Sequence, residues 1–218
     1  MGARTAWPAG SFMSLDEPLR ATMIDMVFPL EGHSLPRDAS PALRAALQRE
    51  MPWLDQAPLA GIHPLKLVPG TDAEALLSQR TRLLLRLPRV RFDDAAGLTG
   101  RTLQLGGHAV TLGQPHAREL LPHRTLYAYA VAAEGEDEIA FMQAMNSELQ
   151  ALEVRSQLIC GKRQQHAWPT GALTTFSLML HGLTASDSLR LQTLGLGRHR
   201  LLGCGIFVPH KSAAAVGE

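Results

Sequence analysis

A run of glycine and basic residues near the C-terminus has the composition of a loop that binds phosphate. The glycines are Gly195, Gly197, Gly203 and Gly205, and the basic residues between them are Arg198, His199 and Arg200. Glycine adopts positive φ readily and lets another backbone approach closely. Backbone N–H groups could then face phosphate oxygens while guanidinium groups supply positive charge. We therefore predict that these residues contact an anionic backbone; the alternative is a flexible hairpin with two solvated arginines.

The spacing of this run, Gly-apolar-Gly followed by a basic stretch and Gly-x-Gly, resembles the glycine-rich loop of the RAMP superfamily of CRISPR-associated proteins. Residues 25–29 and 61–64 add to the likeness, which covers residues 24–208. Within the superfamily, the chain is similar to the CRISPR repeat endoribonucleases, and most of all to a compact type I variant. The resemblance implies a protein that binds CRISPR repeat RNA and cleaves precursor CRISPR RNA to guide RNA.

The resemblance also implies the chemistry. The 2′-hydroxyl beside the scissile bond attacks the neighbouring phosphate without a metal ion, leaving a 2′,3′-cyclic phosphate and a 5′-hydroxyl. The reaction needs one group that accepts the hydroxyl proton, one that protonates the leaving oxygen, and positive charge for the phosphorane-like state. Histidine suits proton transfer, because its unperturbed pKa is about 6.5.

Three residues are candidates for this chemistry. His63 is the first choice, since Gly61 and Pro64 restrict the backbone around it and family members often place a catalytic histidine in this part of the first domain. His33, between the first predicted strand and helix, is the second. Lys66 is a weaker candidate for charge stabilisation, because strand geometry would point it away from His63 unless a bulge intervenes. The alternatives are a strand-entry histidine bonded to backbone and a solvated loop histidine.

Charge is unevenly distributed along the 218 residues. The net charge is only +1, yet residues 155–211 contain seven Lys or Arg and one acid, which gives 7 − 1 = +6. Acidic residues gather earlier, at 134–138. In this basic third, Lys162, Arg163 and Arg155 form a second candidate RNA-binding patch, which could hold the stem of a repeat hairpin through its phosphates. The alternative is a chance asymmetry of solvated charge.

The elements expected to position these residues follow a β-α-β-β-α-β order twice, which is an α+β plan of two tandem ferredoxin-like domains. Helix starts are predicted at Ser40, as the N-cap before Pro41 at the first helical position, at Asp137, and at Thr184 to Asp187. Strands are predicted at 24–30, 62–68, 81–87 and 102–112 in the first half, and at 126–133, 156–160, 174–180 and 206–208 in the second. The predicted divisions are an N-terminal extension at 1–22, a first domain at 23–114, a linker at 115–124, a second domain at 125–210 and a tail at 211–218.

Several function classes are disfavoured. No apolar run approaches the ~18 residues of a membrane span, and no targeting signal is evident, which favours the cytoplasm. Cys160 and Cys204 form no C-x-x-C motif, and the histidines lack metal-ligand spacing, so we expect no metal or cofactor. Repeat RNA is the expected partner, together with other subunits of a Cascade-type effector complex. The rival functions are a non-catalytic RNA-binding subunit of such a complex and an unrelated enzyme whose loop binds a nucleotide.

Overall fold

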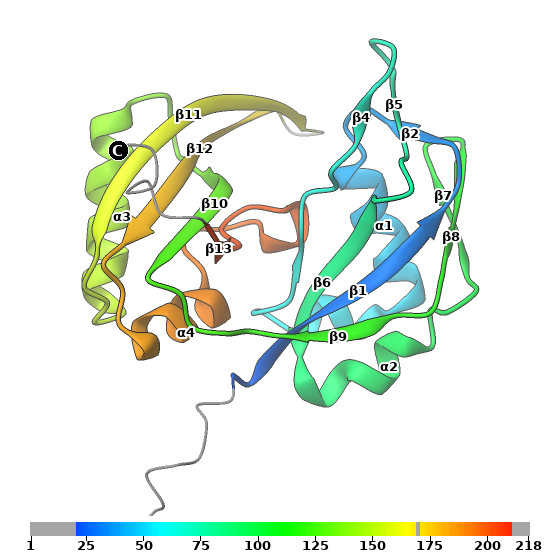
Figure 1. Ribbon diagram of the computed structural model, residues 1–218. Coiled ribbons are helices and arrows are strands. Elements are labelled where there is room, and N and C mark those ends of the chain that lie inside the picture. Colours follow the sequence, from blue (N-terminus) through cyan, green and yellow to red (C-terminus); the bar gives the residue numbers. More distant parts are fainter. Residues whose placement is uncertain (1–20, 169–170, 211–218) are drawn as a thin grey trace, which may run out of the picture.

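The computed structural model describes residues 21–168 and 171–210, which form two halves built from sheets and helices (Figure 1). Residues 1–20 of the predicted extension and the whole predicted tail lie outside the described residues. In the described part of the chain, no helix is both long and apolar enough to cross a membrane.

The first half carries one main sheet and a smaller one. Its elements are β1 (Met23–Glu31), β2 (Ser34–Pro36), α1 (Ser40–Glu50), η1 (Pro52–Gln56), β3 (Gly61–Ile62), β4 (Val68–Pro69), β5 (Glu74–Leu76), β6 (Arg82–Pro88), η2 (Arg89–Arg91), α2 (Phe92–Ala96), β7 (Thr102–Leu105), β8 (His108–Leu112) and β9 (His116–Glu119). The main sheet has the order β3-β6-β1-β8-β7, with β9 also paired to β1, while β2-β5-β4 form the smaller sheet.

The second half is simpler. Its elements are β10 (Thr125–Ala132), α3 (Glu138–Ala151), β11 (Gln157–Trp168), β12 (Gly171–His181), α4 (Ala185–Leu194), η3 (Arg200–Leu202) and β13 (Val208–Pro209). The sheet order is β11-β12-β10-β13, and all its pairs are antiparallel. In the first half, β3-β6-β1-β9 follow the same order and are also antiparallel. This mixed architecture is consistent with the predicted tandem ferredoxin-like plan.

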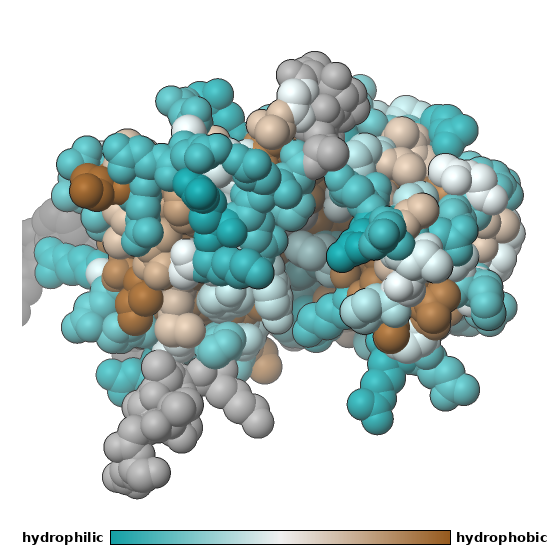
Figure 2. Space-filling view, turned by 90° about the horizontal axis from the view of Figure 1, so that it is seen from above, coloured by the Kyte–Doolittle hydropathy of each residue, from teal (hydrophilic) through white to brown (hydrophobic). Residues whose placement is uncertain are grey.

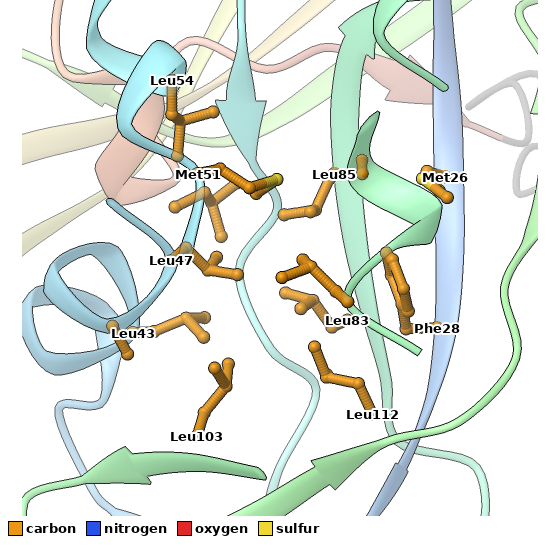
Figure 3. Close-up of a cluster of buried hydrophobic side chains, with 14 of the residues drawn as sticks. Met26, Phe28, Leu43, Leu47, Met51, Leu54, Leu83, Leu85, Leu103 and Leu112 are labelled. Carbon is orange, nitrogen blue, oxygen red and sulfur yellow. The ribbon is translucent and has the colours of Figure 1, made fainter. Parts of the chain in front are cut away.

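Alternation along β6 separates the core face of the first sheet from its opposite face. Leu83, Leu85 and Leu87 are buried against α1, whose apolar stripe includes Leu43 and Leu47 (Figure 3). The residues between those leucines point to the opposite face of the sheet, because side chains alternate along a strand. That opposite face carries Arg82, Leu84 and Arg86 and is turned toward the second half.

A separate core fills the second half. Leu178 and Leu180 of β12 pack with Leu149 of α3, and the Phe141 and Phe176 rings stack with centroids 4.6 Å apart. Asp137 caps α3 by accepting hydrogen bonds from the N–H groups of the first helical turn, and Thr184 caps α4 in the same way, as predicted. The two capped helices therefore begin where the sequence indicated.

Three local predictions were wrong. His116–Glu119, inside the predicted linker, is the strand β9, because its backbone completes the edge of the first sheet beside β1. The cap of α1 is Ala39 rather than Ser40, and no side chain caps it. Of the segment predicted as strand 62–68, only its two end residues lie in strands, Ile62 in β3 and Val68 in β4. Pro64, which has no N–H to donate to a ladder, lies between them.

Candidate active site

Strand register builds a row of charged residues across the face of the first sheet that is turned toward the second half. Asp25 of β1 lies opposite Arg86 of β6 and opposite Arg118 of β9. Arg86 in turn lies opposite Gly61 of β3. His63 comes one residue after β3, and its backbone N–H still donates to a carbonyl oxygen of β6. The pairing thus extends to His63, whose side chain contacts Asp25 on the same face.

The centre of this row is a buried ion cluster. Arg86 donates from Nε to Oδ1 of Asp25 at 2.8 Å and from Nη2 to Oδ2 at 3.1 Å, and Arg118 donates to Oδ2 at 2.6 Å. Arg86 is 0% exposed and Asp25 is 1% exposed. Nη1 of Arg86 donates to the carbonyl oxygens of Gln192 and Phe207 in the second half, at 2.9 and 2.7 Å. Every polar group of the pair is thereby satisfied, which burial of charge requires.

His63 is held at the edge of this cluster. Its Nε2 lies 3.1 Å from Oδ1 of Asp25, and its backbone N–H donates to the carbonyl oxygen of Leu84. Because an ionised carboxylate only accepts hydrogen bonds, Nε2 must carry a proton, which leaves Nδ1 as the basic nitrogen of the neutral ring. Nδ1 has no hydrogen-bond partner among the described residues, and it is not among their fully buried atoms that lack a partner. It is therefore open to solvent or to a ligand.

Electrostatics keeps both members of the His63–Asp25 pair in the states a proton-accepting site requires. Burial lowers the pKa of His63, and the charges of Arg86 and Arg118 act in the same direction, outweighing the opposite effect of Asp25. Burial alone would raise the pKa of Asp25, but its bonds to His63 and Arg86 hold that pKa well below its usual range. At neutral pH the imidazole is neutral and the carboxylate is ionised.

A cavity of about 480 Å³ opens in front of His63, between the two halves. Both halves contribute to it, and Figure 2 shows a hollow between two lobes whose surfaces are mostly hydrophilic. The basic side chains that line it are Lys66, Arg80, Arg82 and Arg118, and His123 lines it as well. Its two carboxylates, Asp25 and Glu119, are each bound by an arginine. The cavity therefore presents excess positive charge to a ligand.

The structure brings Lys66 to His63 and leaves His33 apart. Both Lys66 and His63 line the cavity, because residues 63–67 are not strand and the expected alternation is lost. The ammonium group of Lys66 lies 5.8 Å from the ring centroid of Tyr129, across the gap between the halves. His33 is exposed between β1 and β2, its carbonyl accepts a bond from Leu77, and it does not line this cavity.

The backbone N–H groups of the glycine-rich loop are directed into the protein, contrary to the prediction. Those of Gly195, Gly203 and Gly205 donate to the carbonyl oxygens of Leu191, Arg200 and Ala130. That of Gly197 donates to the side chain of Glu148 at 2.8 Å. The four glycines therefore offer no free N–H group to phosphate.

The glycines serve close packing instead. Gly195 and Gly205 have φ of 71° and 67°, and a Cβ on either one would collide with the carbonyl oxygen of Gly205 or of Leu196. Gly203, with φ of 90°, packs against the ring of Pro64, next to His63. The loop thus fits between the halves and supports the segment that carries His63.

The three basic residues of the loop have different surroundings. Arg200 is 7% exposed, and its guanidinium donates to the carbonyl oxygens of Leu59, Thr193 and Leu194, so the prediction that it contacts phosphate is wrong. Burial and the charge of Arg86 lower the pKa of Arg200 to about 10, although Asp25 opposes this. Arg198 is exposed, 3.8 Å from Glu134, and His199 is exposed with φ of 67°.

The second predicted basic patch lies on and before β11, outside the cavity in front of His63. Arg155 and Lys162 are exposed, and Arg163 is paired with Glu136 at 3.1 Å. Among the described residues, no group of three or more His, Cys, Asp or Glu is arranged to hold a metal ion.

Sequence reasoning missed the ion cluster and most of the basic cavity. Asp25 and Arg86 each interrupt an apolar strand, and a charged residue in such a strand is rarely buried without a partner. That signal could have paired them. Arg80 lies just before β6, Arg82 begins it and Arg118 lies in β9, and no local motif connects them. The pairing of β6 and β9 with β1 brings these parts of the chain together.

Solved structures share the fold of this chain. One titled "CRISPR associated protein Cas6" aligns with a TM-score of 0.63 at 10% identity, covering 87% of this chain and all of that one. Another, titled "An RAMP protein binding different RNA substrates", aligns with a TM-score of 0.61 at 11% identity, covering 84% of this chain and 98% of that one. At this low identity the comparison shows that the chain has the same fold as these two proteins.

Sequence comparison identifies the family. The Cas6 family model, described as "Cas6 Crispr", matches residues 24–212. The CRISPR-associated endonuclease Cas6 of Myxococcus xanthus (strain DK1622) is 34% identical over 194 residues, which are 88% of this chain and 84% of that protein. The chain belongs to the Cas6 family, as the resemblance predicted.

Proposed function

We propose that the protein is an endoribonuclease that binds CRISPR repeat RNA and cleaves precursor CRISPR RNA, with His63 as the general base. The observation that carries the proposal is a neutral, partly accessible imidazole in a cavity lined by Lys66, Arg82 and Arg118. The 34% identical relative is named an endonuclease, which supports the same activity. An RNA substrate matches the cavity, since its phosphates carry the opposite charge.

The arrangement supports attack by the RNA's own 2′-hydroxyl. Nδ1 of His63 accepts the hydroxyl proton, while Asp25 holds Nε2–H and stabilises the imidazolium that forms. The 2′-oxygen bonds to phosphorus and the bond to the 5′-oxygen breaks, which yields a 2′,3′-cyclic phosphate and a 5′-hydroxyl. Lys66 and the cavity arginines stabilise the charge that builds on the phosphoryl oxygens.

Each half has its own task in this proposal. The first half, ferredoxin-like in its strand order, carries the base and the cavity arginines. The second half closes the cavity and presents Arg198, His199, Arg155, Lys162 and Arg163 for contacts with more distant RNA phosphates. We infer that the boundary between the halves follows β9, at residues 120–124.

A single-turnover assay on the repeat of a CRISPR array encoded beside the gene tests the proposal. Replacing His63 with Ala should slow cleavage ~10²-fold or more, the usual contribution of a positioned acid or base. Repeat affinity, measured in parallel, should change far less, since His63 is buried and the phosphate contacts lie elsewhere. His33→Ala is the matched control and should cut at the wild-type rate.

Two outcomes would contradict the proposal. If His33→Ala slows cleavage and His63→Ala does not, the base is His33. If the wild-type protein binds the repeat tightly and never cuts it, the protein is a non-catalytic RNA-binding subunit.

A further inference from the structure

His166 lines a second cavity beside His63, separate from the basic one, although it comes from the opposite half of the chain. It is in β11, paired with Leu173 of β12, and Figure 1 shows the far ends of these two strands reaching toward the first half. A cavity of about 160 Å³ is lined by both His63 and His166. The fold thus brings two histidines, 103 positions apart in the sequence, to one cavity.

The surface between the two histidines is continuous with the basic cavity. Pro64 lines the cavity of about 480 Å³, the cavity of about 160 Å³ and a third one of about 110 Å³. Tyr129 lines the first and the third, and His166 lines the second and the third. An RNA strand whose phosphate contacts the arginines could therefore extend past Pro64 to His166.

The two imidazoles are anchored in the same way. Nε2 of His166 lies 3.2 Å from Oγ1 of Thr175, a residue that is 0% exposed, just as Nε2 of His63 lies 3.1 Å from Asp25. Among the described residues, Nδ1 of His166 has no hydrogen-bond partner, nor is it a fully buried atom without one. Each ring is thus fixed through one nitrogen, while the other nitrogen has no partner among the described residues.

The proposed reaction requires a second proton-transfer group at this place. In an in-line displacement, the attacking and leaving oxygens lie on opposite sides of phosphorus, so one imidazole cannot serve both. Cys204, which lines the third cavity, is a poor acid near neutral pH, because burial raises the pKa of its thiol to about 11. Histidine is the side chain that most readily donates a proton in this pH range.

We propose that His166 is the general acid of the cleavage reaction, a role that rests on the proposed function. As the bond between phosphorus and the 5′-oxygen breaks, the proton on Nδ1 of the His166 imidazolium passes to that oxygen. His63 has meanwhile taken the proton of the 2′-hydroxyl, so the two protons balance. Thr175 keeps Nε2–H in place and acts as a positioning residue.

A substrate with sulfur in place of the 5′-bridging oxygen at the cut site separates the acid from the base. A thiolate leaves without being protonated, so loss of a general acid matters much less. His166→Gln should slow cleavage of the normal repeat ~10²-fold and cut the sulfur substrate within a few-fold of the wild-type rate. His63→Gln should stay slow on both substrates. His116→Ala, an exposed histidine outside the cavities named above, should behave as wild type on both.

The results distinguish failure of this role from failure of the proposed function. If the wild-type protein cuts the repeat and His166→Gln cuts it equally fast, His166 is not the acid. A His166→Gln defect that persists on the sulfur substrate, with unchanged repeat affinity and thermal unfolding, also overturns the role. A wild-type protein that cuts neither substrate overturns the proposed function, and this role with it.

Discussion

Arg86 and Asp25 face each other across β6 and β1, and the guanidinium of Arg86 contacts both oxygens of the carboxylate, at 2.8 and 3.1 Å. The remaining nitrogen of the guanidinium, Nη1, binds carbonyl oxygens of the second half. One side chain thereby orients the carboxylate that holds His63 and joins the two halves. Stability and site geometry are coupled at this residue.

Loss of Arg86 should therefore destabilise the protein strongly. In Arg86→Met, Asp25 loses a buried partner and two carbonyl groups are left unpaired, so the free energy of unfolding should fall by about 3–5 kcal/mol. Urea unfolding measures this. Arg89→Met is the matched control, because Arg89 pairs with Glu119 at the surface, and it should cost less than about 1 kcal/mol. An equal fall in the free energy of unfolding for the two variants would show that the buried Arg86–Asp25 pair contributes no more to stability than a surface pair.

Replacing the two arginines of the glycine-rich loop should have different effects, one on RNA binding and the other on stability. Arg198→Ala should weaken repeat binding and reduce the slope of log affinity against log salt by about 0.7, the value for one phosphate contact on a single strand. Its stability should be unchanged, since Arg198 is exposed. Arg200→Ala should instead lower the free energy of unfolding by about 2 kcal/mol or more, because its bonds to backbone carbonyls are lost. A normal salt slope for Arg198→Ala would mean that this arginine does not touch RNA.

Cleavage should proceed in excess EDTA, because the proposed mechanism draws its nucleophile from the RNA and its proton transfer from imidazole. The rate should match that in buffer containing Mg²⁺, apart from effects of the ion on RNA folding. A substrate with 2′-deoxyribose just upstream of the cut should be bound and left intact. Activity that returns only with added Mg²⁺ or Mn²⁺, or efficient cutting of the deoxy substrate, would rule out this mechanism.

Stability should decrease as the pH falls below about 6.5, the ordinary pKa of histidine. Burial lowers the pKa of His63 in the folded protein, so the unfolded chain takes up this proton first and acid favours unfolding. Asp25, whose pKa is also lowered by folding, adds a further loss at more acidic pH, below about 4. Urea unfolding at pH 7.5 and 5.5 measures the effect, and His63→Gln should lose less stability between these values than the wild type. An equal loss would show that His63 titrates normally.

Local signals in the sequence determined more of the fold than of the site. The caps at Asp137 and Thr184 and the glycine after α4 depend on hydrogen bonds between residues close in sequence, so they could be read directly. The β9 strand could not, because His116–Glu119 has little apolar character of its own and is extended only by pairing with β1. The family could be recognised because its loop pattern is local.

The same difference between local signals and long-range pairing applies to the site. The sequence by itself singled out His63, through the glycine and proline near it and through the family resemblance of this part of the chain. Only the tertiary structure decided what surrounds it, because Asp25, Arg86 and Arg118 meet through strand register across three strands. The tertiary structure also overturned the interpretation of Arg200 and the loop glycines as phosphate-binding groups. Their residue types suit phosphate, but close packing between the halves directs their hydrogen-bond donors to backbone carbonyls and to Glu148. Whether a donor faces a ligand or the protein depends on what packs against it, and no spacing of residues encodes that.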